Sequence, residues 1–356
     1  MKHSLTRRDF LLQSTTAIGA FATLVGGGQG GPAWAGSPAG RSASWAWHPG
    51  NPSPGVTPTA KFSGIFAILS TPFDHTDQVD WEDLEREAVF CIRAGAQGLV
   101  WPQLAGEFYL LSEDERLHGA EVLLHAAAGR TPVVIGVQAP ESHLATKFAR
   151  HAERQGASAI ISLPPYMGST SLETAANYYH ALAHETKLPI FIQNSGPPWG
   201  AALPTEFVIG MAKESPQFGY VKEEVAPVAH RIGEYAMSGV MKGVFSGNAG
   251  RNFLDEYSHG ANGTMPACEF IDVDVQIGAL ALEGKIEQAR GIFAKLLPMI
   301  NLEEIYGLPF VKEVLVRRGV FKTAKLRGIV GGGLDDKDGG ELEAWWKELA
   351  AYARTQ

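Results

Sequence analysis

One lysine closes a short apolar run, and this position favours carbonyl chemistry. Lys222 ends the run Tyr220–Lys222, which follows Phe218 and Gly219. A buried lysine loses the water that stabilises its ammonium form, so the neutral, nucleophilic amine becomes accessible. Such an amine can form a Schiff base with a carbonyl substrate. The same position also suits a lysine that extends its ammonium into solvent from a strand end, so position alone leaves both roles open.

A carboxylate follows this lysine two residues later. Because side chains alternate along a strand, Lys222 and Glu224 would lie on the same face. Carboxylates are common general acids and bases, so we expect Glu224 to reach the site as a catalytic acid or base. The alternative is a carboxylate in a solvated loop, paired with a surface cation.

Eight short apolar runs alternate with longer amphipathic stretches from residue 62 onward. The runs are Ile65–Thr71, Gly98–Pro102, Pro132–Val137, Ala159–Pro164, Pro189–Asn194, Tyr220–Lys222, Gly243–Ser246 and Gly263–Met265. Runs of this kind are typical of parallel strands that are covered on both faces. Eight strand–helix units predict an α/β fold, a (β/α)8 TIM barrel of about 250 residues, with its chemistry at the carboxyl ends of the strands. An open, doubly wound sheet is the alternative, although no Gly-x-Gly-x-x-Gly motif follows the first run.

Local patterns also place helix ends and the C-terminal elements. Ser112 with Glu115 matches a capping box, and Gly95 stands where a helix should stop. We expect helices over 281–300, 309–319 and 341–353, with a solvated turn over 335–340. The predicted barrel covers 61–300, and the predicted C-terminal helical extension, packed on the barrel, covers 301–356.

The N-terminal segment has the ordered features of a twin-arginine (Tat) export signal. Arg7-Arg8 precedes an apolar stretch that is too short for a transmembrane helix, and Ala33-Trp34-Ala35 fits a cleavage site. We therefore predict a signal peptide over 1–35 and a flexible leader, rich in Gly, Pro, Ser and Ala, over 36–60. The Tat machinery would be an export partner of a periplasmic protein with no stable membrane insertion after signal cleavage.

The composition argues against several classes of protein. The 356 residues carry 30 Lys and Arg against 38 Asp and Glu, a net charge of −8, with no basic cluster. This balance argues against a nucleic-acid partner. Two cysteines, Cys91 and Cys268, are too few for a disulfide framework or a Cys-rich zinc site. After export both would face an oxidising compartment, and whether they pair is left open. No pair of metal-binding spacing stands among the 11 histidines, so no metal is expected.

An ordered series of short motifs runs from about residue 62 to about residue 328. The series comprises Thr71-Pro72-Phe73, Gly106-Glu107, Pro164-Pro165-Tyr166, Asn194, Val221-Lys222-Glu223, Phe245-Ser246-Gly247, Gly260-Ala261-Asn262-Gly263 and Pro309-Phe310-Val311-Lys312. With these motifs the chain resembles the dihydrodipicolinate synthase / N-acetylneuraminate lyase family, the class I aldolase-type barrels. The resemblance implies that Lys222 condenses with pyruvate or a longer 2-oxo acid, without metal or external cofactor. In the family, the resulting iminium is an electron sink for carbon–carbon cleavage or formation, and some members dehydrate sugar acids instead.

The resemblance also implies a substrate site and an assembly. The implied substrate-binding residues are Leu104, Ala105, Gly106, Tyr166, Gln193, Gly263 and Met265. The loop at 103–106 would offer backbone N–H groups to a carboxylate, and Glu107 would accept hydrogen bonds from the loop backbone. Family members are commonly tetramers, so we expect a homo-oligomer, a tetramer or a dimer.

The chain departs from the family at its proton-relay positions. Leu104 and Ala105 stand where the family has two threonines, and Gln193 stands where it has a tyrosine. Met167 replaces a second tyrosine of the synthases, and Pro198 replaces an arginine that binds a substrate carboxylate. Glutamine forms hydrogen bonds but is not an acid or base at neutral pH. We therefore expect that the chain is not a true dihydrodipicolinate synthase and that Glu224 replaces the relay.

These observations lead to one main prediction and three alternatives. We predict an exported, Schiff-base-forming lyase of the aldolase type that acts on pyruvate or a longer 2-oxo acid through Lys222. The alternatives are a 2-keto-3-deoxy sugar acid dehydratase, a non-catalytic exported 2-oxo acid binding protein, and a structural partner of another exported protein. Aromatic residues near the strand ends would line a pocket for an apolar or aromatic substrate, cap the barrel rim or pack between subunits. They are Trp101, Phe108, Tyr166 and Trp199.

Overall fold

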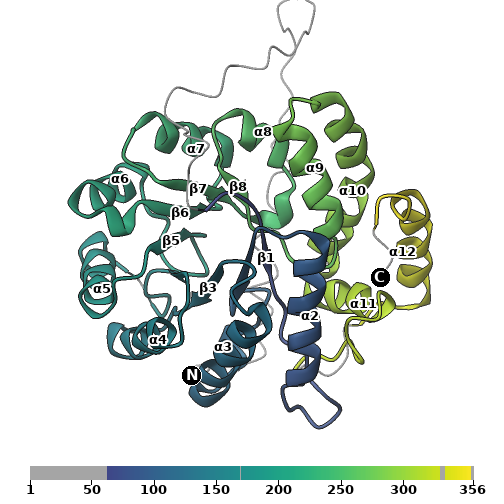
Figure 1. Ribbon diagram of the computed structural model, residues 1–356, viewed down its shortest axis with the longest axis horizontal. Coiled ribbons are helices and arrows are strands. Elements are labelled where there is room, and N and C mark those ends of the chain that lie inside the picture. The colour runs from purple at the N-terminus through teal and green to yellow at the C-terminus, as the bar shows by residue number, and fades with distance from the viewer. Residues whose placement is uncertain (1–61, 169, 329–332, 354–356) are drawn as a thin grey trace, which may run out of the picture. The chain divides into compact units, whose positions relative to one another are not determined.

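Eight parallel strands close into a barrel in the computed structural model, which describes residues 62–168, 170–328 and 333–353 (Figure 1). The strands are β1 (Gly64–Ile68), β2 (Gly98–Trp101), β3 (Val133–Gly136), β4 (Ala159–Ser162), β5 (Ile190–Asn194), β6 (Tyr220–Glu223), β7 (Gly243–Ser246) and β8 (Gly263–Thr264). Each strand pairs with its neighbours in the sequence, and β8 closes the ring against β1. The predicted (β/α)8 barrel is confirmed, and the open doubly wound sheet is excluded.

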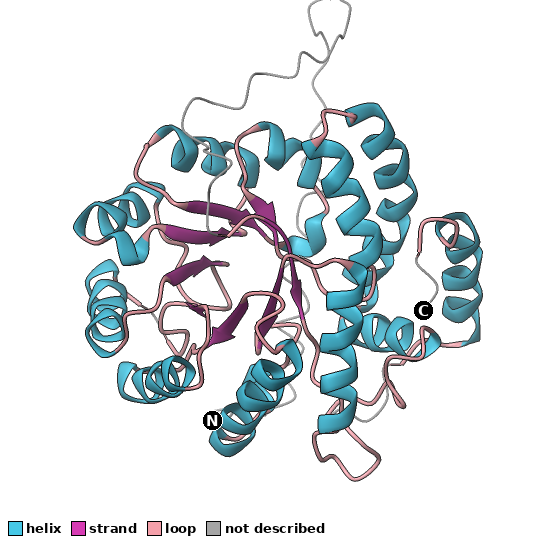
Figure 2. Cartoon of the chain, in the orientation of Figure 1, coloured by secondary structure: helices cyan, strands magenta, loops and turns pink. Residues whose placement is uncertain are grey.

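Helices surround the strands on the outside of the barrel (Figure 2). They are α2 (Trp81–Ala94), α3 (Glu113–Ala127), α4 (Ser142–Arg154), α5 (Leu172–Glu185), α6 (Thr205–Glu214), α7 (Val228–Met237), α8 (Phe253–Ser258), α9 (Ile271–Leu282), α10 (Ile286–Tyr306), α11 (Leu308–Arg317) and α12 (Asp336–Leu349). In the C-terminal part, α10 packs against α9, and both α11 and α12 pack against α10. Short 3-10 turns follow β2 at Phe108–Leu110, precede β6 at Pro216–Phe218 and follow β7 at Asn248–Gly250.

Two expected helix ends are present as predicted. The Ser112 side chain accepts a hydrogen bond from the Glu115 amide at 3.2 Å, and the Glu115 carboxylate accepts one from the Ser112 amide at 2.8 Å. The predicted capping box is therefore confirmed at the start of α3. Gly95 ends α2 at φ 95°, in the left-handed conformation that glycine adopts without strain.

Two expectations for the C-terminal part were wrong. The predicted helix over 281–300 is two helices, because Gly284 between α9 and α10 has φ 73°, which no continuous α-helix allows. The segment 335–340 is not a solvated turn but the N-cap and the first residues of α12. The Asp335 side chain accepts hydrogen bonds from the amides of Lys337 and Asp338, and this cap offsets the cost of the two glycines that follow. The predicted boundary between residues 300 and 301 falls inside α10.

Several predictions concern the N-terminus, the membrane and the cysteines. The predicted export signal (1–35) and leader (36–60) lie outside the described residues. Among the described residues, no helix combines the length and the apolar character needed to cross a membrane. Cys91 and Cys268 are both buried, and both carry free thiols.

Strand side chains alternate between an inner core and an outer core. Phe66, Phe191, Tyr220 and Phe245 fill the barrel interior, where the rings of Phe191 and Tyr220 lie 5.0 Å apart between their centroids. The intervening residues pack outward against the helices. Because alternate residues share a face, Lys222 lies on the inner face of β6, two residues after Tyr220.

Ion pairs and cation–π contacts join the C-terminal segment to the loops that follow β1 and β2. Lys312 on α11 is fully buried, forms an ion pair with Glu107 and lies 4.5 Å from the centroid of the Phe73 ring. The Arg327 guanidinium carbon lies 4.3 Å from the same centroid, and Arg327 pairs with Glu115 at 2.7 Å. A buried ammonium must be paired, so Lys312 fixes the position of Glu107. Glu107 was expected to accept hydrogen bonds from the loop backbone, and it pairs with Lys312 instead.

Glu87 on α2 is a buried carboxyl group with few partners. One of its oxygens accepts hydrogen bonds from the Ser70 amide and from the Cys268 thiol, each at 2.9 Å, and the other oxygen has no partner among the described residues. Burial raises the pKa of Glu87 to about 8. The folded protein therefore holds a proton here that the unfolded chain releases at neutral pH.

We expect Glu87→Gln to change stability little near pH 5 and to stabilise the protein relative to wild type above pH 8. The folded pKa exceeds the unfolded value of about 4.3, so the stabilisation from this proton is complete below that value and is lost as pH rises toward 8. The loss approaches about 1.4 kcal/mol per pH unit for one proton. Urea unfolding at pH 5, 7 and 9 measures the difference. Glu85→Gln, at an exposed position of the same helix, is the control. The prediction would be contradicted if the free energies of unfolding of wild type and Glu87→Gln differed by the same amount at every pH.

Candidate active site

Lys222 and Glu224 face each other at the carboxyl end of β6. The Lys222 Nζ atom lies 3.1 Å from Glu224 Oε1, and the two side chains expose only 5% and 10% of their surface. The alternation expected from the sequence brings them together on the inner face. Neither solvent-exposed alternative, a lysine extended into water or a carboxylate in a solvated loop, describes this pair.

Hydrogen bonds hold the Glu224 carboxylate in place. Gln193 Nε2 donates to Glu224 Oε2 at 2.8 Å, and Ser195 Oγ donates to the same oxygen. Burial by itself raises the pKa of Glu224, but the Lys222 ammonium and the hydrogen bonds from Gln193 and Ser195 together outweigh burial. The net effect holds the pKa of Glu224 below its ordinary value, so this side chain is a carboxylate at neutral pH.

Ser195 is a contact that the sequence analysis missed. It lies two residues after Gln193, just beyond the end of β5. Alternation from Gln193 points it toward the barrel interior, and that pattern was the available signal.

The space that Glu224 occupies depends on a glycine after β7. A Cβ atom at Gly247 would lie 2.2 Å from Glu224 Oε1. The next residue, Asn248, donates from Nδ2 to the Glu224 carbonyl oxygen at 3.1 Å. A larger residue at 247 would displace the carboxylate from Lys222.

The neighbouring carboxylate, Glu223, points outward and fixes the chain at the end of β6. Its Oε1 accepts hydrogen bonds from the amides of Glu224 at 3.0 Å and Val225 at 2.7 Å. Its Oε2 accepts a hydrogen bond from Asn194 Nδ2 at 2.9 Å and lies 3.1 Å from Arg231 Nε. With its backbone held in this way, Glu224 turns inward toward Lys222.

The loop after β2 contributes backbone amides that donate to no described residue. The Gly106 amide donates to the Gln103 carbonyl at 2.9 Å, and the Glu107 amide donates to the Leu104 carbonyl at 3.0 Å. Within the described part of the chain, nothing accepts a hydrogen bond from the amides of Leu104 and Ala105. Ala105 also packs against the inner core. Of the N–H groups predicted for a carboxylate, those of Gln103, Leu104 and Ala105 donate to no described residue, and that of Gly106 is engaged.

The two predicted residues on and after β8 lie in the barrel packing. Met265 is buried in the inner core, and its amide donates to the Ser246 carbonyl at 2.9 Å. A Cβ atom at Gly263 would lie 2.0 Å from the Gly64 carbonyl oxygen and 2.6 Å from the Phe245 ring. Gly263 thus permits the close approach of β8 to its neighbours, and its role toward a substrate stays a prediction.

Four aromatic side chains cluster on the loops after β2, β4 and β5. The Trp199 ring centroid lies 5.1 Å from that of Tyr109, 5.9 Å from that of Phe108 and 6.4 Å from that of Tyr166. Phe108 and Tyr166 are 5.4 Å apart between centroids. Three of the four aromatic residues chosen from the sequence are therefore brought together. Tyr109 was missed, although it follows Phe108 directly.

Trp101 does not belong to this cluster. It is fully buried on the outer side of β2, and its Nε1 donates to Thr71 Oγ1 at 3.0 Å. The expectation that Trp101 lines a pocket or caps the rim was wrong, because one residue earlier Val100 points inward and alternation turns Trp101 outward. Met167, which replaces the second tyrosine, is 70% exposed.

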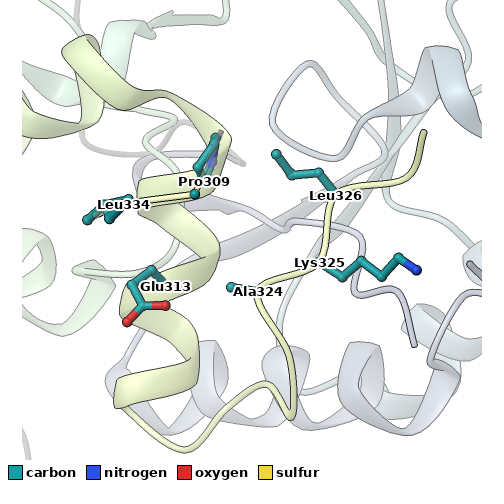
Figure 3. A pocket seen from close by; sticks show the side chains of 7 residues that line it. Pro309, Glu313, Ala324, Lys325, Leu326 and Leu334 are labelled. Carbon is teal, nitrogen blue, oxygen red and sulfur yellow. The ribbon is translucent and has the colours of Figure 1, made fainter. Parts of the chain in front are cut away.

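Two hollows in the described structure lie away from this pair. One, open to solvent, is lined by α11 and the segment after it, including Pro309, Glu313, Lys325 and Leu326 (Figure 3). The other lies between the start of β1 and helices α8 and α9. Neither is lined by Lys222 or Glu224. The two hollows are therefore separate from the buried ion pair inside the barrel. Across the described ranges, no group of three His, Cys, Asp or Glu side chains could hold a metal ion.

We expect Gly247→Ala to displace the Glu224 carboxylate and to destabilise the protein by about 1–3 kcal/mol, because the added methyl group overlaps a buried ion pair. Urea unfolding measures the loss, and a crystal structure of the variant shows the carboxylate position. Gly210→Ala is the control, since a Cβ atom at this position of α6 meets nothing within 4 Å. An unchanged Lys222–Glu224 distance in Gly247→Ala would refute the prediction.

Comparison with known proteins identifies similar chains. A profile of the dihydrodipicolinate synthetase family matches residues 61–336. The chain is 28% identical over 266 residues to an L-2-keto-3-deoxyarabonate dehydratase of Azospirillum brasilense, covering 73% of this chain and 86% of the relative. It is 29% identical over 260 residues to a probable 2-dehydro-3-deoxy-D-pentonate aldolase of Escherichia coli (strain K12), covering 70% and 84%.

Solved structures agree in fold. A dihydrodipicolinate synthase structure superimposes with a TM-score of 0.75 at 27% identity, covering 81% of this chain and 99% of that chain. A prophage protein of the dihydrodipicolinic acid synthase family from Escherichia coli K12, solved in complex with pyruvate, has a TM-score of 0.75 at 22% identity, covering 82% and 99%. The second likeness shows the fold alone.

Proposed function

Because the chain belongs to the dihydrodipicolinate synthetase family, a family of lyases and aldolases, we propose that it forms a Schiff base between Lys222 and pyruvate or a longer 2-oxo acid. The observation that carries the proposal is a buried amine 3.1 Å from a carboxylate at the carboxyl end of a barrel strand. This is where barrel enzymes carry their chemistry.

The ion pair defines the first proton transfer. The Lys222 ammonium must lose a proton before it can attack, and Glu224 Oε1 is in position to accept that proton. The neutral amine then adds to the ketone carbon to give a carbinolamine. The Glu224 carboxyl returns its proton to the departing hydroxyl, which leaves as water, and an iminium forms. The iminium withdraws electrons from the carbon next to it. The bond between that carbon and the following carbon can therefore break or form.

The substrate carboxylate has a place in the loop after β2. The free amides of Leu104 and Ala105 would donate to its oxygens, as charge-assisted hydrogen bonds. Neither side chain supplies a hydroxyl, so this loop would bind the carboxylate without taking part in proton transfer. Glu224 then carries the acid–base chemistry.

The substitutions favour a reaction other than dihydrodipicolinate synthesis. Leu104, Ala105 and Gln193 cannot replace the hydroxyls expected at their positions, and general acid–base catalysis is worth typically about 10²–10⁴-fold. We therefore propose aldol cleavage or formation of 2-oxo acids. Dehydration of a 2-keto-3-deoxy sugar acid is the second candidate, favoured by the likeness to the L-2-keto-3-deoxyarabonate dehydratase. A non-catalytic 2-oxo acid binding protein is the remaining alternative, and the Lys222–Glu224 pair argues against it.

We also propose where the protein acts and how it assembles. The twin arginines and the cleavage site within residues 1–35 support export by the Tat machinery to the periplasm. The family resemblance supports a homo-oligomer.

Borohydride reduction in the presence of pyruvate tests the Schiff base. We expect intact-mass spectrometry to detect one reduced adduct on the wild type and none on Lys222→Ala. Lys295→Ala, which removes a partly exposed lysine on α10, is the control and should keep the adduct. If neither pyruvate nor a panel of longer 2-oxo acids is captured, Lys222 is not a working nucleophile and the binding-protein alternative takes precedence.

Glu224→Gln tests the acid–base role while keeping the side-chain shape. We expect turnover of a 2-oxo acid to fall by about 10²–10⁴-fold. The wild-type rate should decline in acid only below the ordinary glutamate pKa of about 4.3, because Lys222 and Gln193 hold the pKa of Glu224 low. Initial rates from pH 3 to 9 measure both effects, and Glu214→Gln, at an exposed position of α6, is the control. Wild-type turnover in Glu224→Gln would rule out the role.

A further inference from the structure

The two cysteines of the chain meet at one place in the fold. Cys91 lies on α2 and Cys268 lies just after β8, far apart in the sequence. Both side chains are fully buried, and the two thiols hydrogen-bond to each other. Either cysteine alone would fill its core position as a small apolar side chain, so packing does not require that they meet. Their contact places two sulfur atoms where they can react with each other.

The cysteines belong to the two units that flank the seam at which the barrel closes. β8 has two residues, and it pairs with β1 at two positions, whereas β5 and β6 pair at four. A single bridge between Ile68 and Ala267 extends this pairing, and Cys268 follows Ala267 directly. Cys91 lies on the helix that follows β1. A bond between the two sulfurs would therefore join the first and the last strand–helix units across a very short strand.

Glu87 fixes the arrangement of the two sides of this seam. Its Oε1 accepts hydrogen bonds from the Ser70 amide after β1 and from the Cys268 thiol, each at 2.9 Å. Cys91 lies four residues after Glu87 on α2, so the two side chains share one face of the helix. The Glu87 carboxyl group thus holds the Cys268 sulfur against the helix face that carries Cys91.

Burial keeps both thiols protonated in the packed barrel. Desolvation raises the pKa of Cys91 and of Cys268 above the ordinary value. The thiolate is the nucleophile in disulfide exchange, and neither side chain is exposed to a dissolved oxidant. Exchange therefore takes place while the seam is open, and the packed barrel afterwards shields the bond from reduction.

We propose that Cys91 and Cys268 form a disulfide bond that closes the barrel covalently at the seam between β1 and β8 when the protein is in an oxidising compartment. The proposed export to the periplasm would supply this compartment. The inference does not depend on the proposed Schiff base, because both sulfurs lie in the outer core, between the strands and the helices.

The bond forms by exchange with an organic disulfide such as glutathione disulfide. One cysteine thiolate attacks a sulfur of glutathione disulfide, whose S–S bond breaks and releases one glutathione thiolate. The other cysteine thiolate then attacks the cysteine sulfur of the mixed disulfide and releases the second glutathione. The two cysteines are oxidised, glutathione disulfide is reduced, and the two cysteine protons end on the released glutathione sulfurs.

Refolding in a glutathione redox buffer tests the bond. The full chain is unfolded in urea, refolded with reduced and oxidised glutathione at mildly alkaline pH, and then alkylated with iodoacetamide in urea. We expect intact-mass spectrometry to detect a chain without alkylated cysteine, lighter than the reduced chain by two hydrogen atoms. The same chain treated with dithiothreitol before alkylation should carry two carbamidomethyl groups.

Thermal unfolding tests whether the bond stabilises the seam. The closed loop spans most of the barrel, so the bond restricts the unfolded chain strongly. We expect the oxidised wild type to unfold at a temperature about 5–10 °C higher than the same protein reduced with a phosphine. Cys91→Ala and Cys268→Ala are the matched controls. Neither can form the bond, so their unfolding temperatures should not respond to the reductant.

Each outcome decides one point. Two alkylated cysteines, a glutathione on each cysteine or two chains linked through sulfur would overturn the inference, and the cysteines would then be core residues only. A disulfide that leaves the unfolding temperature unchanged would overturn its stabilising role at the seam. If the variants do not fold, the mass of the wild type decides alone. If the wild type does not refold, the same alkylation of the chain secreted into a bacterial periplasm decides.

Discussion

The barrel interior holds two opposite charges, and much of the surrounding structure serves to make that burial tolerable. Moving an ammonium and a carboxylate out of water costs several kcal/mol each, and their attraction repays this only when the geometry is good and the remaining hydrogen-bonding groups are satisfied. Lys222 has Glu224 at 3.1 Å, and Glu224 has Gln193 and Ser195 as donors. These residues therefore act as one unit. Removing any one of them would leave a buried charge less well paired, and the free-energy cost of burying that charge would no longer be offset.

A second buried ion pair links the C-terminal helices to the site. Burial raises the pKa of Glu107 and lowers that of Lys312, so desolvation works against both charges and their contact offsets it. Glu107 directly follows the loop that carries the free amides of Leu104 and Ala105. The extension after the barrel is thus part of what positions the proposed carboxylate site.

Periodic features of the fold were predictable from the sequence, and contact-dependent features were not. The eight apolar runs, the Ser112 capping box and the shared face of Lys222 and Glu224 follow from spacings of two to four residues, so the sequence alone indicates them. The clearance that Gly247 gives to Glu224 and the Glu107–Lys312 pair join segments far apart in the chain, and no local pattern encodes them. The error at Trp101 has a physical reason, because its run is apolar throughout and does not indicate which of Val100 and Trp101 points into the barrel.

The exchange of a tyrosine for Gln193 changes where protons can move. An amide cannot transfer protons at neutral pH, but it can orient a carboxylate that does. In this barrel Glu224 lies against the lysine nitrogen, so its reach favours the steps that take place there, the formation and breakdown of the proposed iminium. Protons at distant atoms of a substrate lie beyond this carboxylate and would come from water or from the substrate itself.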